Sequence, residues 1–527
     1  MTAPITPGAV HGRAASERGA GERRARRKTE QSSGVPQPPW APIRNPMPPL
    51  ELLDEEGLGR LDDTALRVLE ELGVEFLSDP ALNIFEKAGC KVNRATRLVR
   101  FERAMVREIV RQAPRRFKIH ARNPERSITL GDNTINVGPV GSPPNVSDLD
   151  RGRRPGAFED QCNLIKLHQS LTCVHHSGGT PVEALDLPPE SRHLDLYRAH
   201  SVYSDRAFMA RAIGRERISD AIEIACAARG VSKEQLAAEP SLLTVINVNS
   251  PRRVDKELVA GLIEMTQHGQ PCIVTPFTLA GAMSPVTVAG ALAQQTAEAL
   301  AVMVLIQLLK PGIPMVFGGF TSNVDMKSGA PAFGTPEYVR ATIIGGQIAR
   351  RWGLPYRSSN VNASNCVDAQ STYESAMSIW ACVMSHTSFM HHGTGWLEGG
   401  LVASFEKSIV DAEMIHQMRA WLDPMDLSDD ALAFEALKEV QPGGHFFGAA
   451  HTMARYEKAF YRPMISDWRN FQSWAEAGAL TATQRANTVW KRLLESYVEP
   501  PLDPGRKEAI DAFVAKRKEE IAKRGIL

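Results

Sequence analysis

Short apolar runs alternate with longer stretches of helical periodicity through the middle of the chain. The runs are rich in Val, Ile, Phe and Met, and each ends in residues such as Gly, Ser, Asn, Thr or His. This alternation is typical of a parallel sheet whose strands are joined by crossover helices. The expected strands are residues 134–139, 171–176, 207–212, 243–249, 271–277, 313–319, 354–360 and 388–392.

The spacing of the eight runs favours a closed barrel. Successive runs begin roughly 30–40 residues apart, which leaves room for a strand, a helix and two loops. Eight such units predict an α/β fold, a (β/α)8 TIM barrel within residues 126–422. A doubly wound open sheet is the alternative. Such sheets usually have a G-x-G-x-x-G turn after the first strand, and "VGPVGS" at 137–142 is not one.

The segments that flank the expected barrel have different patterns. Residues 1–46 are rich in Ala, Gly, Pro and Arg and lack a long apolar stretch, which predicts a disordered basic arm. Residues 47–125 show helical periodicity and are expected to form an N-terminal helical segment. Residues 423–527 are expected to form a C-terminal helical extension of the barrel.

Composition and charge limit the classes of partner. The chain has 61 basic and 60 acidic residues, so we expect no nucleic acid to bind. No apolar run approaches the ~20 residues needed to cross a bilayer, so no membrane association is expected. Seven cysteines without C-x-x-C spacing are typical of reduced thiols. We therefore expect a cytoplasmic protein, a homo-oligomer, whose partners are small molecules or proteins.

Two pairs of adjacent histidines stand at expected strand ends, which form the mouth of a TIM barrel. They are His175–His176 and His391–His392. Neighbouring residues on a strand face opposite sides, so we expect His176 and His392 to lie behind the barrel. A catalytic zinc usually has three protein ligands, and no expected strand end supplies a carboxylate. No metal site is therefore expected, and a metal-dependent lyase or hydrolase stays an alternative.

Aromatic residues recur in the loops at the same rim. The faces of such rings attract quaternary ammonium groups by ~0.5–2 kcal/mol each. A single ring is more often core packing, but several rings beside neutral polar groups favour a methylated amine as ligand. A betaine-binding protein without catalytic activity is a further alternative. The loop at 318–337 is long enough to predict a lid over this site.

Several long motifs resemble the trimethylamine methyltransferase family. They include "GTPEYVRATIIGGQIARRWGLPYRSSN" at 334–360, "SFMHHGTGWLEGG" at 388–400 and "GGHFFGAAHTM" at 443–453. The resemblance runs from about residue 46 to the C-terminus and implies a (β/α)8 barrel. It also implies transfer of a methyl group from a methylated amine to the cobalt of a corrinoid (cobalamin). No histidine has the D-x-H-x-x-G signature of a corrinoid-binding domain, so the cofactor is expected on a separate corrinoid protein.

One stretch departs from the archaeal members of that family. Those proteins carry pyrrolysine near the end of strand seven, about where this chain has "NASNCVDAQ" at 362–370. The chain is therefore similar to the branch without pyrrolysine, which includes glycine betaine:corrinoid methyltransferase. A quaternary amine leaves as a neutral amine and needs no acid catalyst, so we expect catalysis by positioning.

Candidate site residues follow from the rim positions and this resemblance. We predict His391 and Asn360 as catalytic residues. The predicted substrate-binding residues are Phe277, Phe320, Trp396, Asn247, Asn249, His175, Tyr373 and Glu398.

Overall fold

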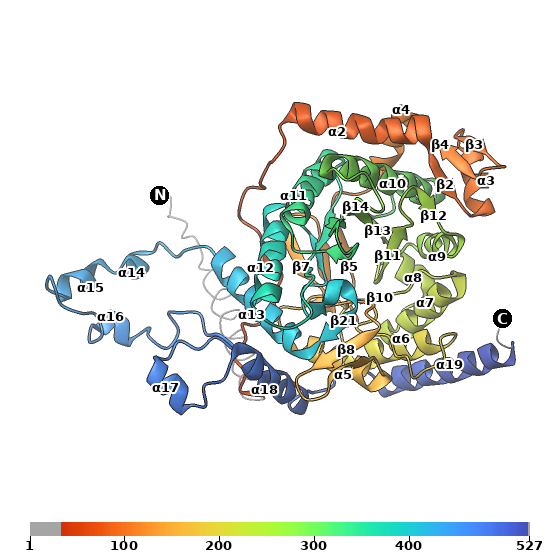
Figure 1. Ribbon diagram of the computed structural model, residues 1–527. Coiled ribbons are helices and arrows are strands. Elements are labelled where there is room, and N and C mark those ends of the chain that lie inside the picture. The colour runs from red at the N-terminus through yellow and green to blue at the C-terminus, as the bar shows by residue number, and fades with distance from the viewer. Residues whose placement is uncertain (1–32, 525–527) are drawn as a thin grey trace, which may run out of the picture.

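A barrel of parallel strands surrounded by helices forms the centre of the computed structural model, which describes residues 33–524 (Figure 1). The predicted TIM barrel is confirmed. The sheet has the strand order β1-β7-β19-β18-β15-β13-β11-β10. Its parallel strands are β7 (Thr134–Val137), β10 (Phe208–Met209), β11 (Leu242–Val248), β13 (Cys272–Pro276), β15 (Met315–Gly318), β18 (Tyr356–Ser359) and β19 (Phe389–His391).

The prediction of a second strand at residues 171–176 is wrong, because this segment does not form a regular strand. The chain turns at Leu171, where the backbone N–H of Val174 donates to the Leu171 carbonyl at 3.2 Å. Only the end of the segment reaches its neighbours. His175 N donates to the Val137 carbonyl at 2.7 Å, and Ser177 N donates to the Ala207 carbonyl at 3.0 Å. These bonds join the segment to β7 on one side and β10 on the other, so it fills the place of the missing strand.

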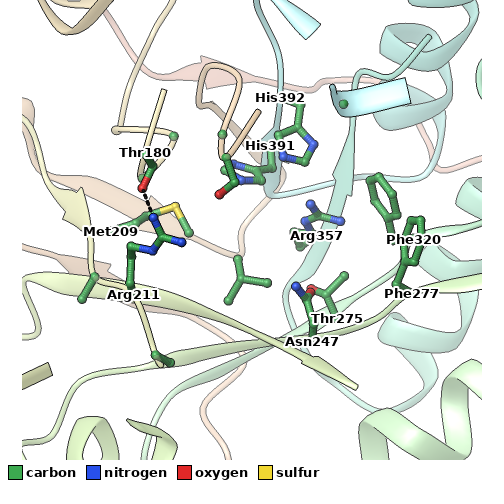
Figure 2. A pocket seen from close by; sticks show the side chains of 18 of the residues that line it. Thr180, Met209, Arg211, Asn247, Thr275, Phe277, Phe320, Arg357, His391 and His392 are labelled. Carbon is green, nitrogen blue, oxygen red and sulfur yellow. Dashed lines mark hydrogen bonds between the residues drawn. The ribbon is translucent and has the colours of Figure 1, made fainter. Parts of the chain in front are cut away.

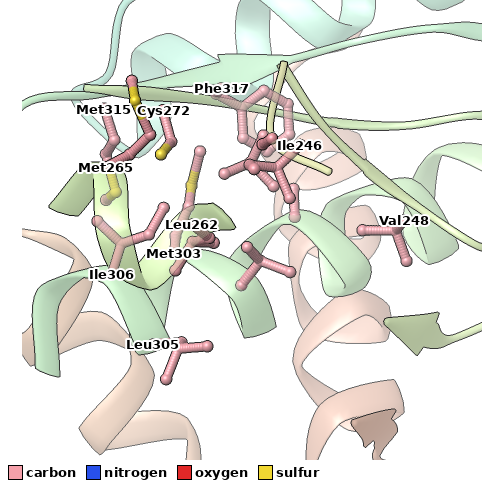
Figure 3. Close-up of a cluster of buried hydrophobic side chains, with 14 of the residues drawn as sticks. Ile246, Val248, Leu262, Met265, Cys272, Met303, Leu305, Ile306, Met315 and Phe317 are labelled. Atoms are coloured by element: carbon pink, nitrogen blue, oxygen red, sulfur yellow. The ribbon is translucent and has the colours of Figure 1, made fainter. Parts of the chain in front are cut away.

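Helices cover the outside of the barrel and supply most of the core. The cluster in Figure 3 places Leu262 and Met265 of α9 and Met303 of α10 against Cys272 and Met315 of the sheet. The covering helices are α5 (Phe158–Ser170), α6 (Arg192–Tyr203), α7 (Arg215–Arg229), α8 (Lys233–Ala238), α9 (Lys256–Gln267), α10 (Val288–Leu309), α11 (Pro336–Arg351), α12 (Ala369–Met384) and α13 (Phe405–Leu422).

Helix α10 is the one described helix long and apolar enough to cross a membrane. It lies between the barrel and the N-terminal helices (Figure 1), and 83% of its most apolar window is buried inside the protein. Packing on two sides explains its hydropathy, because a helix that is apolar all round is a buried one.

The N-terminal segment is helical as expected but also contains short strands. Its helices are α2 (Glu55–Arg67), which continues as a π-helical turn (Val68–Leu72), α3 (Asp79–Lys87) and α4 (Arg103–Val110). Strands this short carry too few residues for a period-2 signal. They are β2 (Val74–Phe76), β3 (Lys91–Asn93) and β4 (Leu98–Arg100), which join β12 (Arg253–Val254) in one sheet.

A hairpin closes the N-terminal end of the barrel. Its strands are β5 (Phe117–Ile119) and β6 (Ile128–Leu130), which follow each other through a 3-10 turn (Pro124–Arg126). Ile119 and Leu130 pack with the inward side chains of Leu243, Ile273 and Phe389. The opposite, C-terminal end of the barrel is the end that remains open to ligands.

The disordered arm predicted for residues 1–46 extends too far along the chain. Val35 and Ile43 are buried, and Trp40 donates from its indole nitrogen to the Val174 carbonyl at 3.0 Å. Strand β1 (Ile43–Arg44) pairs antiparallel with β7. Residues 33–46 are therefore ordered, because their apolar side chains find a surface on the barrel. Residues 1–32 of the predicted arm lie outside the described residues.

The predicted lid is folded as part of a small sheet. Strands β16 (Thr321–Val324) and β17 (Pro331–Ala332) pair antiparallel, and β14 (Thr278–Ala280) pairs with β16. Thr335 caps α11, since its Oγ1 accepts from Tyr338 N at 3.2 Å. A second loop sheet joins β8 (Asn145–Asp148), β9 (Gly152–Pro155), β20 (Trp396–Leu397) and β21 (Val402–Ser404), with a 3-10 turn (Glu398–Gly400) between the last two.

The C-terminal extension has two parts. Helices α18 (Ala482–Glu495) and α19 (Pro504–Lys523) pack on the barrel helices, α18 against α5 and α13, and α19 against α6 and α7. Between α13 and α18 a segment of short helices projects to the side (Figure 1). These helices are α14 (Asp429–Leu432), α15 (Phe434–Glu439), α16 (Ala450–Met453) and α17 (Phe471–Glu476).

Candidate active site

A cavity of about 370 Å³ lies at the C-terminal ends of the barrel strands (Figure 2). Strands β11, β13, β18 and β19 each contribute an inward side chain to it: Asn247, Thr275, Arg357 and His391. The loops after the strands add aromatic rings and the backbones of several glycines. The predicted location of the site, at the barrel mouth, thus coincides with this cavity.

Both His391 and His392 line the cavity, with ring centroids 4.0 Å apart. We expected His392 behind the barrel because side chains alternate along a strand. That expectation is wrong, because β19 ends at His391 and His392 has a φ of 55°, which turns its ring back towards the cavity. Burial lowers the pKa of each imidazole well below its usual value, so both rings are neutral at pH 7.

His175 and His176 lie on the opposite sides of the barrel wall from those expected. His176 lies inside the barrel, stacked on Phe389 with ring centroids 3.9 Å apart. The ring of His175 faces outward. Its Nδ1 accepts from Val137 N at 3.1 Å, and its Nε2 lies 3.0 Å from the Ala41 carbonyl oxygen. Because 171–176 is not a regular strand, its alternation could not be read from the sequence. His175 does not line the cavity, which does not suit its predicted role in substrate binding.

Three of the predicted aromatic residues meet at the cavity wall. Phe277 and Phe320 have ring centroids 5.2 Å apart, and Phe320 and Trp396 lie 6.1 Å apart. Phe333, in the loop that was predicted to be a lid, packs behind them, with its ring centroid 5.6 Å from that of Phe320. Trp396 also lies against His392, at 4.1 Å between centroids. This wall joins loop residues from three different parts of the chain.

The remaining predicted residues do not line the cavity. Asn360 is fully buried and its Nδ2 donates to the Gly393 carbonyl at 3.0 Å, which holds the loop after His392. Asn249 lies beyond the end of β11, in a backbone bridge to Arg253. Tyr373 is 59% exposed on the outer face of α12. Glu398 points away to an ion pair with Arg153 at 3.0 Å.

Arg357 is a cavity residue that was not predicted from the sequence. Its side chain is 2% exposed, and its guanidinium lies 5.0 Å from the centroid of the Phe320 ring. Its Nη1 donates to the Gly319 carbonyl at 3.2 Å. Burial lowers the pKa of Arg357 to about 10, which still leaves it charged at pH 7. A signal was present, because an arginine within the run "LPYRSSN" must have a buried partner or ligand.

The cavity has a positive electrostatic character. Arg211 also lines it, although this side chain is paired with Glu183 at 2.6 Å. Among the described residues, no Asp or Glu side chain lines the cavity. Residues 33–524 also contain no group of three His, Cys, Asp or Glu side chains that could hold a metal ion. The donor set that a zinc lyase or hydrolase would use is therefore not found in this part of the chain.

Similar proteins agree with the fold and with the motifs. A family model described as trimethylamine methyltransferase (MTTB) matches residues 18–522. Glycine betaine methyltransferase of Desulfitobacterium hafniense (strain Y51) is 34% identical over 420 residues, 80% of this chain and 87% of that protein. Trimethylamine methyltransferase MttB of Desulfitobacterium hafniense (strain DSM 10664 / DCB-2) is 25% identical over 435 residues, 82% of this chain and 86% of the relative.

A solved structure supports the same fold. The crystal structure of the hydroxylamine MtmB complex has a TM-score of 0.51 to this chain at 9% sequence identity. The match covers 96% of this chain and 93% of the other, so the likeness extends over the whole fold. From the family model and the 34% identical relative, the chain belongs to the trimethylamine methyltransferase family and is a methyltransferase.

Proposed function

We propose that this protein takes a methyl group from a quaternary amine related to glycine betaine and passes it to the cobalt of a corrinoid on a separate protein. The observation that carries the proposal is a cavity walled by Phe277, Phe320 and Trp396, with no carboxylate lining it in the described residues. Aromatic faces bind a quaternary ammonium without the desolvation problem that an acidic group would bring. The similarity to glycine betaine methyltransferase supports the same class of substrate.

The reaction requires little acid or base catalysis from the protein. The C–N bond breaks, the electron pair stays on nitrogen, and the amine leaves neutral without a proton. The corrinoid supplies the reduced cobalt that accepts the methyl group. What remains for the chain is to orient the substrate and exclude water, which is catalysis by positioning. Two neutral histidines and an aromatic wall suit that task.

Glycines around the cavity suit the approach of a flat macrocycle. Gly178 and Gly179 line the cavity with backbone alone, and Gly399 and Gly400 do so beside Phe333 and Trp396. Positions without side chains leave room for a planar ring held by another protein. We therefore place the docking site of the corrinoid protein at this mouth.

The predicted catalytic pair divides into two different roles. His391 lines the cavity, so we assign it to contact with the substrate. Asn360 acts through the loop whose Gly393 carbonyl it holds, so it is a positioning residue. Asn247 lines the cavity below Arg357 (Figure 2) and is assigned to substrate binding as well.

A methyl-transfer assay tests the proposal. Purified protein is mixed with cobalamin reduced to Co(I) and with glycine betaine, carnitine, proline betaine or trimethylamine. We expect the absorbance of methylcobalamin to appear with at least one quaternary amine and not with trimethylamine. Tight binding of a betaine without methyl transfer would favour the non-catalytic alternative. Transfer from trimethylamine alone would contradict the proposal.

A further inference from the structure

Arg357 differs from the other buried cations of this protein in having almost no partner. Lys407 is fully buried but forms an ion pair with Asp411. Arg206 is buried and donates to three main-chain carbonyls, those of His168, Gln169 and Leu171. Arg357 makes one hydrogen bond to protein, to Gly319. No Asp or Glu of the described residues forms an ion pair with it, and its Nε has no partner.

Other residues that line the same cavity also have a buried polar atom without a partner in the described chain. These atoms are Thr275 Oγ1, His391 Nδ1 and His392 Nδ1. Buried polar groups are hydrogen-bonded in nearly all native proteins, and an unpaired buried charge is the least favourable case of all. Because four residues with such unpaired groups, Arg357 included, line one cavity, the cavity suits a polar ligand.

The geometry of Arg357 suits a carboxylate in particular. Nη1 is occupied by Gly319 and the ring of Phe320 covers one face of the guanidinium, so the edge that includes Nε remains for a ligand. Figure 2 places this group between His391 and His392 on one side and Asn247 and Thr275 on the other. An arginine edge is the usual partner of a planar oxyanion, because its N–H groups match the two oxygens.

We infer that Arg357 binds the carboxylate of a zwitterionic substrate, so that the cavity selects betaines over amines that carry only a positive charge. The inference rests on the function proposed above and adds the recognition of the second, anionic end of the substrate. With the carboxylate on Arg357, the ammonium lies towards Phe277 and Trp396. An amine without an anionic group meets the uncompensated charge of Arg357 instead, and repulsion opposes its binding.

A binding experiment separates this inference from the methyl-transfer proposal, because it uses no corrinoid. The affinities of glycine betaine, its demethylated product dimethylglycine, choline and tetramethylammonium are measured by calorimetry with the wild type, Arg357→Gln and Arg357→Lys. We expect the two carboxylates to bind the wild type at least about 30-fold more tightly than choline or tetramethylammonium. Arg357→Gln should lose this preference, and Arg357→Lys should retain part of it.

Controls exclude a general loss of structure. Arg116→Gln removes an arginine that is 62% exposed and lies on the closed end of the barrel, and it should bind every ligand as the wild type does. Far-ultraviolet circular dichroism checks the fold of each variant. Choline binding as tightly as glycine betaine, or unchanged betaine affinity in a folded Arg357→Gln, would overturn the inference. Selective betaine binding without any methyl transfer would overturn the proposed function and leave the carboxylate site standing.

Discussion

Lys407 and Asp411 form an ion pair that is completely buried behind the loop following His392. Asp411 Oδ2 accepts from Gly395 N at 2.9 Å, and Lys407 Nζ donates to Ser375 Oγ at 2.7 Å. Both residues belong to α13, four positions apart, so they meet on one face of the helix. The pair therefore ties the first turns of α13 to the glycine loop that leads to Trp396, one of the three rings of the aromatic wall.

Removing one member of this pair should be more damaging than removing both. Lys407→Met leaves the Asp411 carboxylate buried without its counter-charge, which costs about 3–5 kcal/mol in the free energy of unfolding. Lys407→Met combined with Asp411→Leu should recover a large part of that loss, because no buried charge remains. Urea unfolding followed by circular dichroism measures all three proteins. A double variant less stable than the single one would show that the charges themselves are stabilising.

The aromatic wall should matter for substrate affinity and an exposed ring should not. Phe277→Ala removes a ring face from the cavity, and we expect betaine affinity to fall about 10- to 30-fold. Tyr373→Ala is the matched control, since Tyr373 is exposed on α12. Calorimetry with glycine betaine compares the two. Equal effects of both substitutions would mean that the wall does not contact the ammonium.

Gly138 must remain without a side chain for the stacked rings of the site to form. A Cβ at this position would lie 1.9 Å from Cε1 of His176, the ring that stacks on Phe389. Gly138→Ala should cost about 1–3 kcal/mol of stability through overpacking. It should also reduce methyl transfer, because His391 lies next in the stack, 6.3 Å from His176.

Gly448→Ala is the control for this substitution, because nothing lies within 4 Å of a Cβ built there. It should change neither stability nor methyl transfer. Thermal unfolding and the cobalamin assay are run on both variants. A Gly138→Ala protein with wild-type stability would contradict the described position of His176.

Stability should fall as the pH drops below about 6.5. Burial lowers the pKa of His168, His175 and His416 to about 3, and that of His176 and His200 to about 4. These groups are neutral when folded and gain a proton on unfolding, so their contribution is present above the unfolded pKa of ~6.5. It is lost progressively from pH 6.5 down to the folded values, at up to ~1.4 kcal/mol per pH unit for each histidine.

Urea unfolding at pH 7.5, 6.5 and 5.5 measures this slope. His416→Gln removes one of the titrating groups, which in the wild type has Thr172 Oγ1 as its neighbour at 3.2 Å. The variant should show a shallower decline between pH 6.5 and 5.5 than the wild type. Identical slopes would mean that His416 does not change its protonation on unfolding.

Several cavity residues could be predicted from the sequence, because their place in the cavity follows from their position at the end of a strand. His391, Asn247 and Phe277 come at the ends of apolar runs, and the carboxyl ends of barrel strands converge on one mouth. Asn249, one residue past β11, does not line the cavity, and neither do Glu398 and Tyr373, which follow the ends of β19 and β18 by seven and fourteen residues. Beyond a strand end, the direction of a side chain depends on the path of the loop or on the next helix, which the periodicity of the strand does not describe.

The sequence by itself determined the barrel, because alternating apolar strands and amphipathic helices bury their faces in one main way whatever the details of packing. It also determined which loops carry rings. Only the tertiary structure decided that His392 turns into the cavity while His175 turns out of it, and that Arg357 stands there without a counter-charge. Those outcomes depend on backbone dihedrals at single residues and on neighbours such as Gly319 and Thr275, which lie far from Arg357 in the chain and meet it only when the barrel closes.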